Sequence, residues 1–187
     1  MQHQLESPLQ SLIDLGAAGV QHIHSDLAAH FQGTSDRLLR WGNEEPLCLA
    51  GLFHAVYGTF GLDERLVGLE DRPLIEEIIG RDAEEIVYFY GACNRALTYP
   101  EICRSDTPVV HDRFTNGTRV PNLDELKSFA ELTVANEIDV AAHDLGHYLA
   151  NYGQYVLTLF RNQRFQQLLS QPALAECERY FGPTNSN

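Results

Sequence analysis

The stretch Pro46–Gly58, PLCLAGLFHAVYG, decides the fold because it is apolar on nearly every side. Proline is favoured in the first turn of a helix, so Pro46 marks a helix start. A helix that is hydrophobic all round belongs in the interior of a protein. We therefore expect residues 46–58 to form the central helix of a bundle, with the imidazole of His54 among apolar neighbours.

Helix signals dominate the flanking sequence, and strand signals are scarce. Asn122 followed by Glu125 resembles a capping box at the start of a long helix. The dipeptide Asn116-Gly117 favours a tight turn, so a short hairpin or ordered loop is expected near residues 104–121. The predicted class is all-α, a helical bundle. Besides 46–58, the predicted helices cover residues 8–16, 20–31, 35–42, 72–80, 82–97, 123–150, 154–169 and 172–180, with a break at Gly33-Thr34 between the second and the third.

Length and composition point to one domain that works without nucleic acid. The chain has 187 residues, which suits a single domain over 1–187 with a core at about 20–150 and C-terminal helices at 154–180. A net charge of -13 would repel a nucleic-acid backbone. No apolar segment approaches a membrane span, and the four cysteines form no CxxC pair, so we expect a cytoplasmic protein with no membrane partner. The oligomeric state is not predicted.

His54 carries the strongest functional signal in the chain. A buried imidazole must find polar partners, which a backbone carbonyl, a tyrosine or a metal ion could supply. His30 lies in an earlier helix, and Asp26, four residues before it, shares its face and could orient it. We predict that the His30 and His54 side chains approach one another closely enough to share an ion or a water molecule.

The long predicted helix carries a polar stripe. Asn136, Asp139, His143 and His147 occur at i, i+3, i+7 and i+11 and share one face. Two histidines at i and i+4 can bind one metal ion, although a hydrogen-bonded polar face would show the same spacing. We expect the first half of the stripe to face His30 and His54, with Asp139 and His143 as the candidates for proton transfer.

The stretch from His30 through AGLFHAVYGT resembles the first two metal-binding helices of the HD superfamily, in particular the HD domains of guanosine tetraphosphate hydrolases. In those domains a histidine precedes an AxLLHD motif, and His30 and His54 align with its two histidines. ELTVANEID resembles the late helix that supplies the last metal-binding aspartate, at the position of Asn136. The chain also resembles an uncharacterised HD-like subfamily with HS, HLxGT, WG and AGLFHSxYGT motifs, matched by His24-Ser25, His30 to Thr34, Trp41-Gly42 and Ala50 to Thr59.

The HD doublet is degenerate, because Ala55 replaces its aspartate and Gly58-Thr59 replaces an acidic pair. The resemblance implies a metal site of His30, His54 and Asn136, and the polar stripe offers Asp139 and His143 as conditional extra ligands. Few carboxylates favour Fe, Zn or Ni over Mg. Thr59 and Arg95 are the candidate substrate contacts.

These patterns predict an HD-like protein that binds a divalent metal ion and acts on a small molecule. A metal-dependent hydrolase of the phosphoester type and an HD-like oxygenase both fit, because HD-like folds host both reactions. The alternative is a non-enzymatic ligand-binding or regulatory module that has kept the pocket. Ala55, Gly58 and Asn136, which stand where the family has carboxylates, are the support for that alternative.

Overall fold

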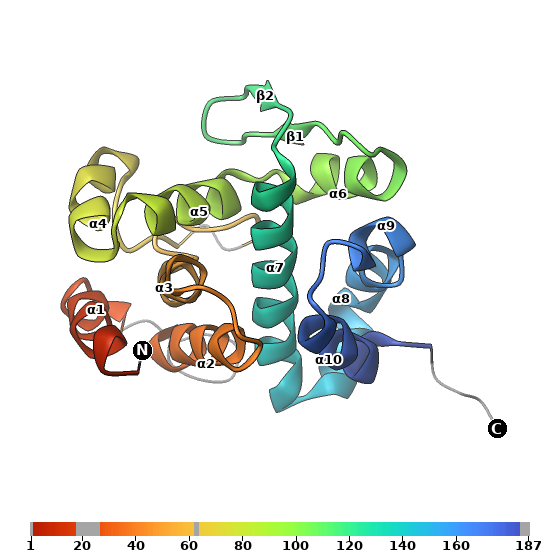
Figure 1. Cartoon of the computed structure of the whole chain (residues 1–187), viewed down its shortest axis with the longest axis horizontal. Coiled ribbons are helices and arrows are strands. Elements are labelled where there is room, and N and C mark those ends of the chain that lie inside the picture. Colours follow the sequence, from red (N-terminus) through yellow and green to blue (C-terminus); the bar gives the residue numbers. More distant parts are fainter. Residues whose placement is uncertain (1, 18–26, 62–63, 184–187) are drawn as a thin grey trace.

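A computed structural model describes residues 2–17, 27–61 and 64–183 of the chain (Figure 1). This part of the chain has an all-α fold with a single small hairpin, as predicted. The helices are α1 Gln2–Asp14, α2 Leu27–Arg40, α3 Glu45–Phe53, α4 Arg72–Ile79, α5 Arg81–Ala92, α6 Arg95–Arg104, α7 Leu123–His143, α8 Leu145–Phe160, α9 Gln163–Gln166 and α10 Gln171–Phe181; the hairpin pairs β1 Val110–His111 with β2 Thr118–Arg119.

Helix α7 runs through the middle of the molecule, with α1 to α5 on one side and α8 to α10 on the other (Figure 1). Its side chains from Phe129 to Ile138 are all buried, so it packs on both flanks at once. One apolar cluster joins α1 to α5, and a second joins α7 to α6, α8, α9 and α10. In the described part of the chain, no helix is long and apolar enough to cross a membrane.

Helix α3 is the buried central helix that the sequence predicts. Every residue from Leu47 to Phe53 is buried, and Pro46 lies in its first turn. The helix ends earlier than predicted, because residues 54–57 form a turn and Gly58 adopts a φ of 73°, which is left-handed. His54 is therefore the C-terminal cap of α3 rather than a residue of its middle.

The predicted break at Gly33-Thr34 is wrong, because α2 continues through both residues. Thr34 donates its hydroxyl to the His30 carbonyl oxygen at 3.0 Å, which a helix accommodates. Gly33 allows α2 to pack closely on α7, because a Cβ atom at this position would lie 2.3 Å from Oδ1 of Asp139. The start of the predicted helix 20–31, with His22 and His24, lies outside the described residues.

Two other predicted helices are each divided. The segment 123–150 changes direction at Asp144, whose side chain accepts a hydrogen bond from the His147 amide and caps α8. The segment 82–97 ends at Ala92, and α6 starts after the cap Asn94. The predicted 154–169 helix consists of the second half of α8 and the short α9, while the prediction at 172–180 is confirmed by α10.

The predicted turn signals near the hairpin are confirmed. Asn122 and Glu125 form the reciprocal capping box at the start of α7, with distances of 2.9 and 2.7 Å. Asn116 adopts a φ of 57° in the turn between β1 and β2. Local side-chain chemistry thus determines both features.

Candidate functional site

A pocket of about 370 Å³ lies where α2, the end of α3, the start of α6, α7 and α8 meet. Its polar lining includes His30, His54, Thr59, Arg95, Asn136 and Glu137. Its aromatic lining includes Phe60, Tyr148, Tyr152 and Tyr155. A mostly apolar cleft with a few converging polar groups is the usual form of a small-molecule site.

His30 lies on the second turn of α2 and is 4% exposed. Its Nδ1 atom is 2.8 Å from Oδ2 of Asp139, and its Nε2 atom is 3.1 Å from Oδ1 of Asn136. Both partners come from α7, where i and i+3 side chains share a face. The first half of the predicted polar stripe therefore does face His30.

His54 is 2% exposed and donates Nδ1–H to the Gly51 carbonyl oxygen at 2.7 Å. Its ring centroid lies 5.1 Å from that of His30, so the predicted approach of the two histidines is present. The rings of Phe31 and Tyr90 pack edge-on against His54, at 5.0 and 5.6 Å. These rings exclude water from the histidine pair on two sides.

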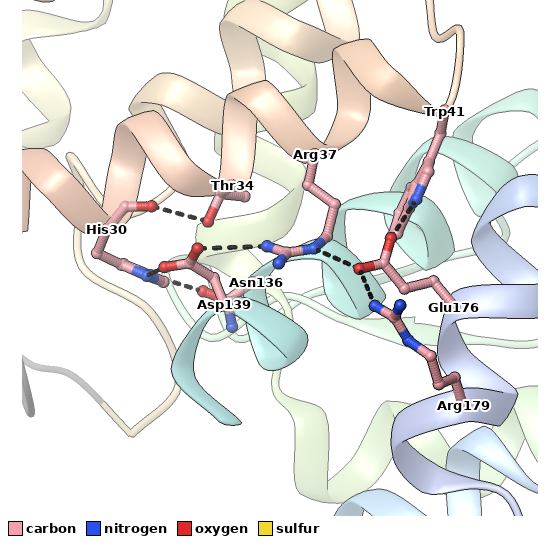
Figure 2. Close-up of polar contacts among 8 residues, drawn as sticks. All are labelled: His30, Thr34, Arg37, Trp41, Asn136, Asp139, Glu176 and Arg179. Carbon is pink, nitrogen blue, oxygen red and sulfur yellow. Dashed lines mark hydrogen bonds and ion pairs between the residues drawn. The ribbon is translucent and has the colours of Figure 1, made fainter. Parts of the chain in front are cut away.

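The Asp139 carboxylate is part of a chain of charges that reaches the C-terminal helix (Figure 2). Its Oδ1 atom accepts from Arg37 at 3.2 Å, and Arg37 also donates Nε–H to Glu176 of α10 at 3.3 Å. Glu176 in turn accepts from Trp41 at 2.8 Å. The chain runs from His30 to α10 through mostly buried side chains, so α10 helps to fix the histidine.

Glu137 joins the pocket wall to α6 and α8. Its carboxylate accepts from Arg95 at 3.2 Å, from the Asn136 amide at 3.1 Å and from the Tyr148 hydroxyl at 2.5 Å. Burial, followed by the charge and hydrogen bond of Glu137, raises the pKa of Tyr148 well above its usual range. The phenol therefore stays protonated and serves as a donor.

The bond from Asn136 Nδ2 to Glu137 also fixes which amide atom faces His30. Because the NH2 group is used by Glu137, the carbonyl oxygen Oδ1 is turned toward His30 Nε2. His30 Nδ1 already faces a carboxylate. Both ring nitrogens thus face oxygen acceptors, which requires either a proton on each nitrogen or a cation between Nε2 and Oδ1.

The structure brings five of the predicted site residues into one pocket: His30, His54, Thr59, Arg95 and Asn136. Asp139 is not among the lining residues and lies on the Nδ1 side of His30, where it orients the ring. His143 is exposed at the end of α7, and His147 is exposed on α8. The break at Asp144 separates His147 from the rest of the stripe, whereas His143 is still the last residue of α7.

Five contributors to the site were not predicted. Glu137 does not lie on a face shared with a predicted ligand, so no spacing signal points to it, whereas Arg37 follows His30 at i+7 and shares its face of α2. Tyr148, Tyr152 and Tyr155 follow at i, i+4 and i+7, a helical stripe that can be found by eye in the sequence. They belong to α8, whose orientation depends on the turn at Asp144.

The possible metal donors beside His30 are two imidazoles and one amide oxygen, because the Glu137 carboxylate of the pocket already accepts from Arg95, Asn136 and Tyr148. Among the described residues, no group of three or more His, Cys, Asp or Glu side chains is arranged to hold a metal ion. A third donor must therefore be the Asn136 oxygen. This neutral set suits borderline metals such as zinc or iron better than magnesium, which prefers carboxylates.

Comparison with known proteins finds one similar family, and its description gives no activity. Residues 11–95 are similar to a family described as a domain of unknown function (DUF6817). This segment includes His30 and His54 and ends at Arg95, whereas Asn136 lies beyond it. No curated protein and no solved structure matches the chain.

Proposed function

We propose that the pocket binds a divalent metal ion through Nε2 of His30, Nε2 of His54 and Oδ1 of Asn136, and acts on a small molecule. The observation that carries this proposal is the orientation of the two imidazoles. Each Nδ1 has an oxygen acceptor, Asp139 for His30 and the Gly51 carbonyl for His54. In a neutral ring of this tautomer the lone pair is on Nε2, as in most metal-binding histidines.

The contact between His30 and Asn136 supports the same assignment. Two acceptor atoms at 3.1 Å repel one another unless a proton or a cation lies between them. Asp139 bonds to His30 on the Nδ1 side of the ring, and Arg37 in turn donates a hydrogen bond to Asp139 at 3.2 Å. Such support of a ligand by a carboxylate is the usual second contact of a metal-bound histidine.

The resemblance to HD domains supports the proposal from the sequence side. The residues that align with that family's histidines and late aspartate, His30, His54 and Asn136, are neighbours in the fold. Ala55 also lines the pocket beside His54, at the position of the lost aspartate. The loss of two carboxylates favours Fe, Zn or Ni over Mg at this site.

Two reaction classes suit such a pocket, hydrolysis of a phosphoester-type bond and oxygenation. A bound metal ion would supply Lewis acidity in either case. The chain's own residues would hold the substrate against the aromatic lining of the pocket and exclude water with Phe31 and Tyr90. Thr59 and Arg95 are the polar groups available to orient the substrate.

The test is the metal content of the purified full-length chain, measured by inductively coupled plasma mass spectrometry. We expect close to one equivalent of a transition metal in the wild type and a loss of it in His54→Gln. The matched control is His143→Gln, an exposed histidine outside the pocket lining, which should keep the metal. Equal metal content in a folded His54→Gln variant would contradict the proposal.

The absence of a carboxylate from the donor set favours a second candidate, a metal-free binding module. In that case the contacts of His30 with Asp139 and Asn136 hold the ring in place without a metal ion. The same measurement separates the two candidates. A wild-type chain that stays free of metal after dialysis against zinc or iron, yet still binds small molecules in the pocket, would establish the binding module.

A further inference from the structure

Three buried polar atoms near the pocket have no hydrogen-bond partner in good geometry, although the Tyr90 hydroxyl lies close to the Arg95 guanidinium. They are the hydroxyl oxygens of Tyr90 and Tyr99 and the Nε atom of Arg95, and they are the only such side-chain atoms among the described residues. Tyr90 is 0% exposed, Tyr99 5% and Arg95 8%. Unpaired buried groups are rare and costly, so three in one place point to a missing partner.

Two of these atoms belong to phenols that lie near the Arg95 guanidinium, to which the third atom belongs. The Arg95 carbon Cζ lies 4.9 Å from the centroid of the Tyr90 ring. Burial raises the pKa of both Tyr90 and Tyr99, while the charge of Arg95 opposes the shift. Both phenols therefore stay protonated, and both lie within reach of the Arg95 charge.

The carboxylate next to Arg95 does not supply the missing acceptor. Glu137 takes one bond from Arg95 and two more from Asn136 and Tyr148. The Glu137 oxygens are thus occupied by these three donors, and none of the three bonds comes from Arg95 Nε. An arginine fork that keeps unused N–H groups is suited to a carboxylate or a phosphate.

The side chains around the three donors indicate the chemistry of the rest of the ligand. Tyr155 of the pocket stacks on Tyr99, with centroids 5.4 Å apart and an angle of 29°. Tyr90 packs against His54 at 5.6 Å on its other side. The three donors therefore lie between the histidine pair and the aromatic wall.

We propose that Arg95, Tyr90 and Tyr99 form a subsite for an oxyanion, so that the small molecule is an organic acid or a phosphate ester with an apolar or aromatic body. The anionic group takes Arg95 Nε and the two hydroxyls, and the body lies along Tyr152 and Tyr155. This inference rests on the proposed function only because both concern the same pocket. It requires no bound metal ion.

The first arm of the test is thermal stability without ligand. Tyr90→Phe and Tyr99→Phe each remove a hydroxyl that has no partner, so we expect an unchanged or higher Tm. The matched control is Tyr57→Phe, because the Tyr57 hydroxyl donates to Glu84 at 2.9 Å and its loss should lower the Tm. A fall in Tm for both test variants as large as that of the control would show an internal water in the subsite and overturn the proposal.

The second arm is calorimetric titration of the EDTA-treated chain with benzoate, phenyl phosphate and, as the neutral control, benzyl alcohol. We expect benzoate or phenyl phosphate to bind, and the better of the two identifies the carboxylate or phosphate class. Tyr90→Phe and Tyr99→Phe should each weaken it about tenfold, the loss of one hydrogen bond to a charged group. Binding that is equal for benzyl alcohol, equal in both variants, or absent for both anions would overturn the subsite. Because the chain in this arm is free of metal, its result does not depend on the outcome of the metal-content measurement.

Discussion

Replacing Gly33 by alanine would place a methyl group where the Asp139 carboxylate lies. The new Cβ atom would be 2.3 Å from Oδ1, 3.0 Å from Cγ and 3.2 Å from Oδ2 of Asp139. A carboxylate without hydrogen bonds could rotate away from the methyl group at little cost in free energy. Here it is held by His30 at 2.8 Å and by Arg37 at 3.2 Å, so the methyl group and these two bonds compete for the same space.

The expected cost follows from these two bonds. In an ordinary helix interior, Gly→Ala stabilises by about 1 kcal/mol. The loss of two hydrogen bonds to a charged carboxylate costs about 1.5 kcal/mol each at the lower end of their range. The net effect is a loss of about 2 kcal/mol in the free energy of unfolding, or about 4–8 °C in Tm for a chain of this size.

The assay is urea unfolding followed by circular dichroism, with Gly153→Ala as the matched control. Gly153 lies inside α8, and the nearest atoms to its new Cβ, on Leu149, are at an ordinary 3.4 Å. We expect this control to be as stable as the wild type or more so. The same Gly33→Ala change should become stabilising in an Asp139→Ala background, since the obstacle is gone.

The result that would refute this reasoning is a Gly33→Ala chain as stable as Gly153→Ala. An equal loss with and without the Asp139 carboxylate would refute it as well. The first result would mean that the Asp139 carboxylate can be displaced without loss and does not hold His30 as described, and the second would mean that the loss has a source other than this carboxylate.

Other expected outcomes concern the pocket and the buried thiols. Ala55→Asp should strengthen zinc binding in calorimetric titration by restoring a carboxylate; unchanged or weaker binding by the folded variant would contradict the alignment. Tyr148→Phe should lower the free energy of unfolding by about 1.5–3 kcal/mol, since it removes a 2.5 Å bond to the buried Glu137; an unaltered urea midpoint would argue against that bond. Burial, with a smaller contribution from neighbouring glutamates for Cys48, raises the pKa of Cys48 and of Cys93 to about 11. The contribution of these thiols to stability should therefore be constant below about pH 9 and fall between about pH 9 and 11, where they ionise only in the unfolded chain; urea midpoints that stay level between about pH 9 and 11 would contradict their burial.

The fold class could be predicted because its signals are local. Pro46 and an unbroken apolar run suffice to place α3, and the Asn122 and Glu125 side chains cap α7 within one turn. The division of the long helix at Asp144 was missed because the polar spacing of Asn136 to His147 continues in register across it. Asp144 is itself a good N-cap residue, so the signal for the start of α8 is present in the sequence.

The site could be predicted only in part, for a physical reason. His30 and His54 stand out as imidazoles in apolar helices, and their alignment with HD domains brings them together. The helix-breaking tendency of Gly33 was overestimated, because its small size serves a contact with α7 that no local pattern reveals. Contacts of this kind, including those of Arg37 and Glu137, depend on how the helices pack.

The most direct test of the central claim is X-ray diffraction from crystals of the full chain grown with zinc, measured on both sides of the zinc absorption edge. The account predicts an anomalous difference peak in the pocket, about 2.0–2.2 Å from Nε2 of His30 and of His54 and next to Oδ1 of Asn136. A pocket without a peak, or a peak found only at the exposed His143 and His147, would contradict it.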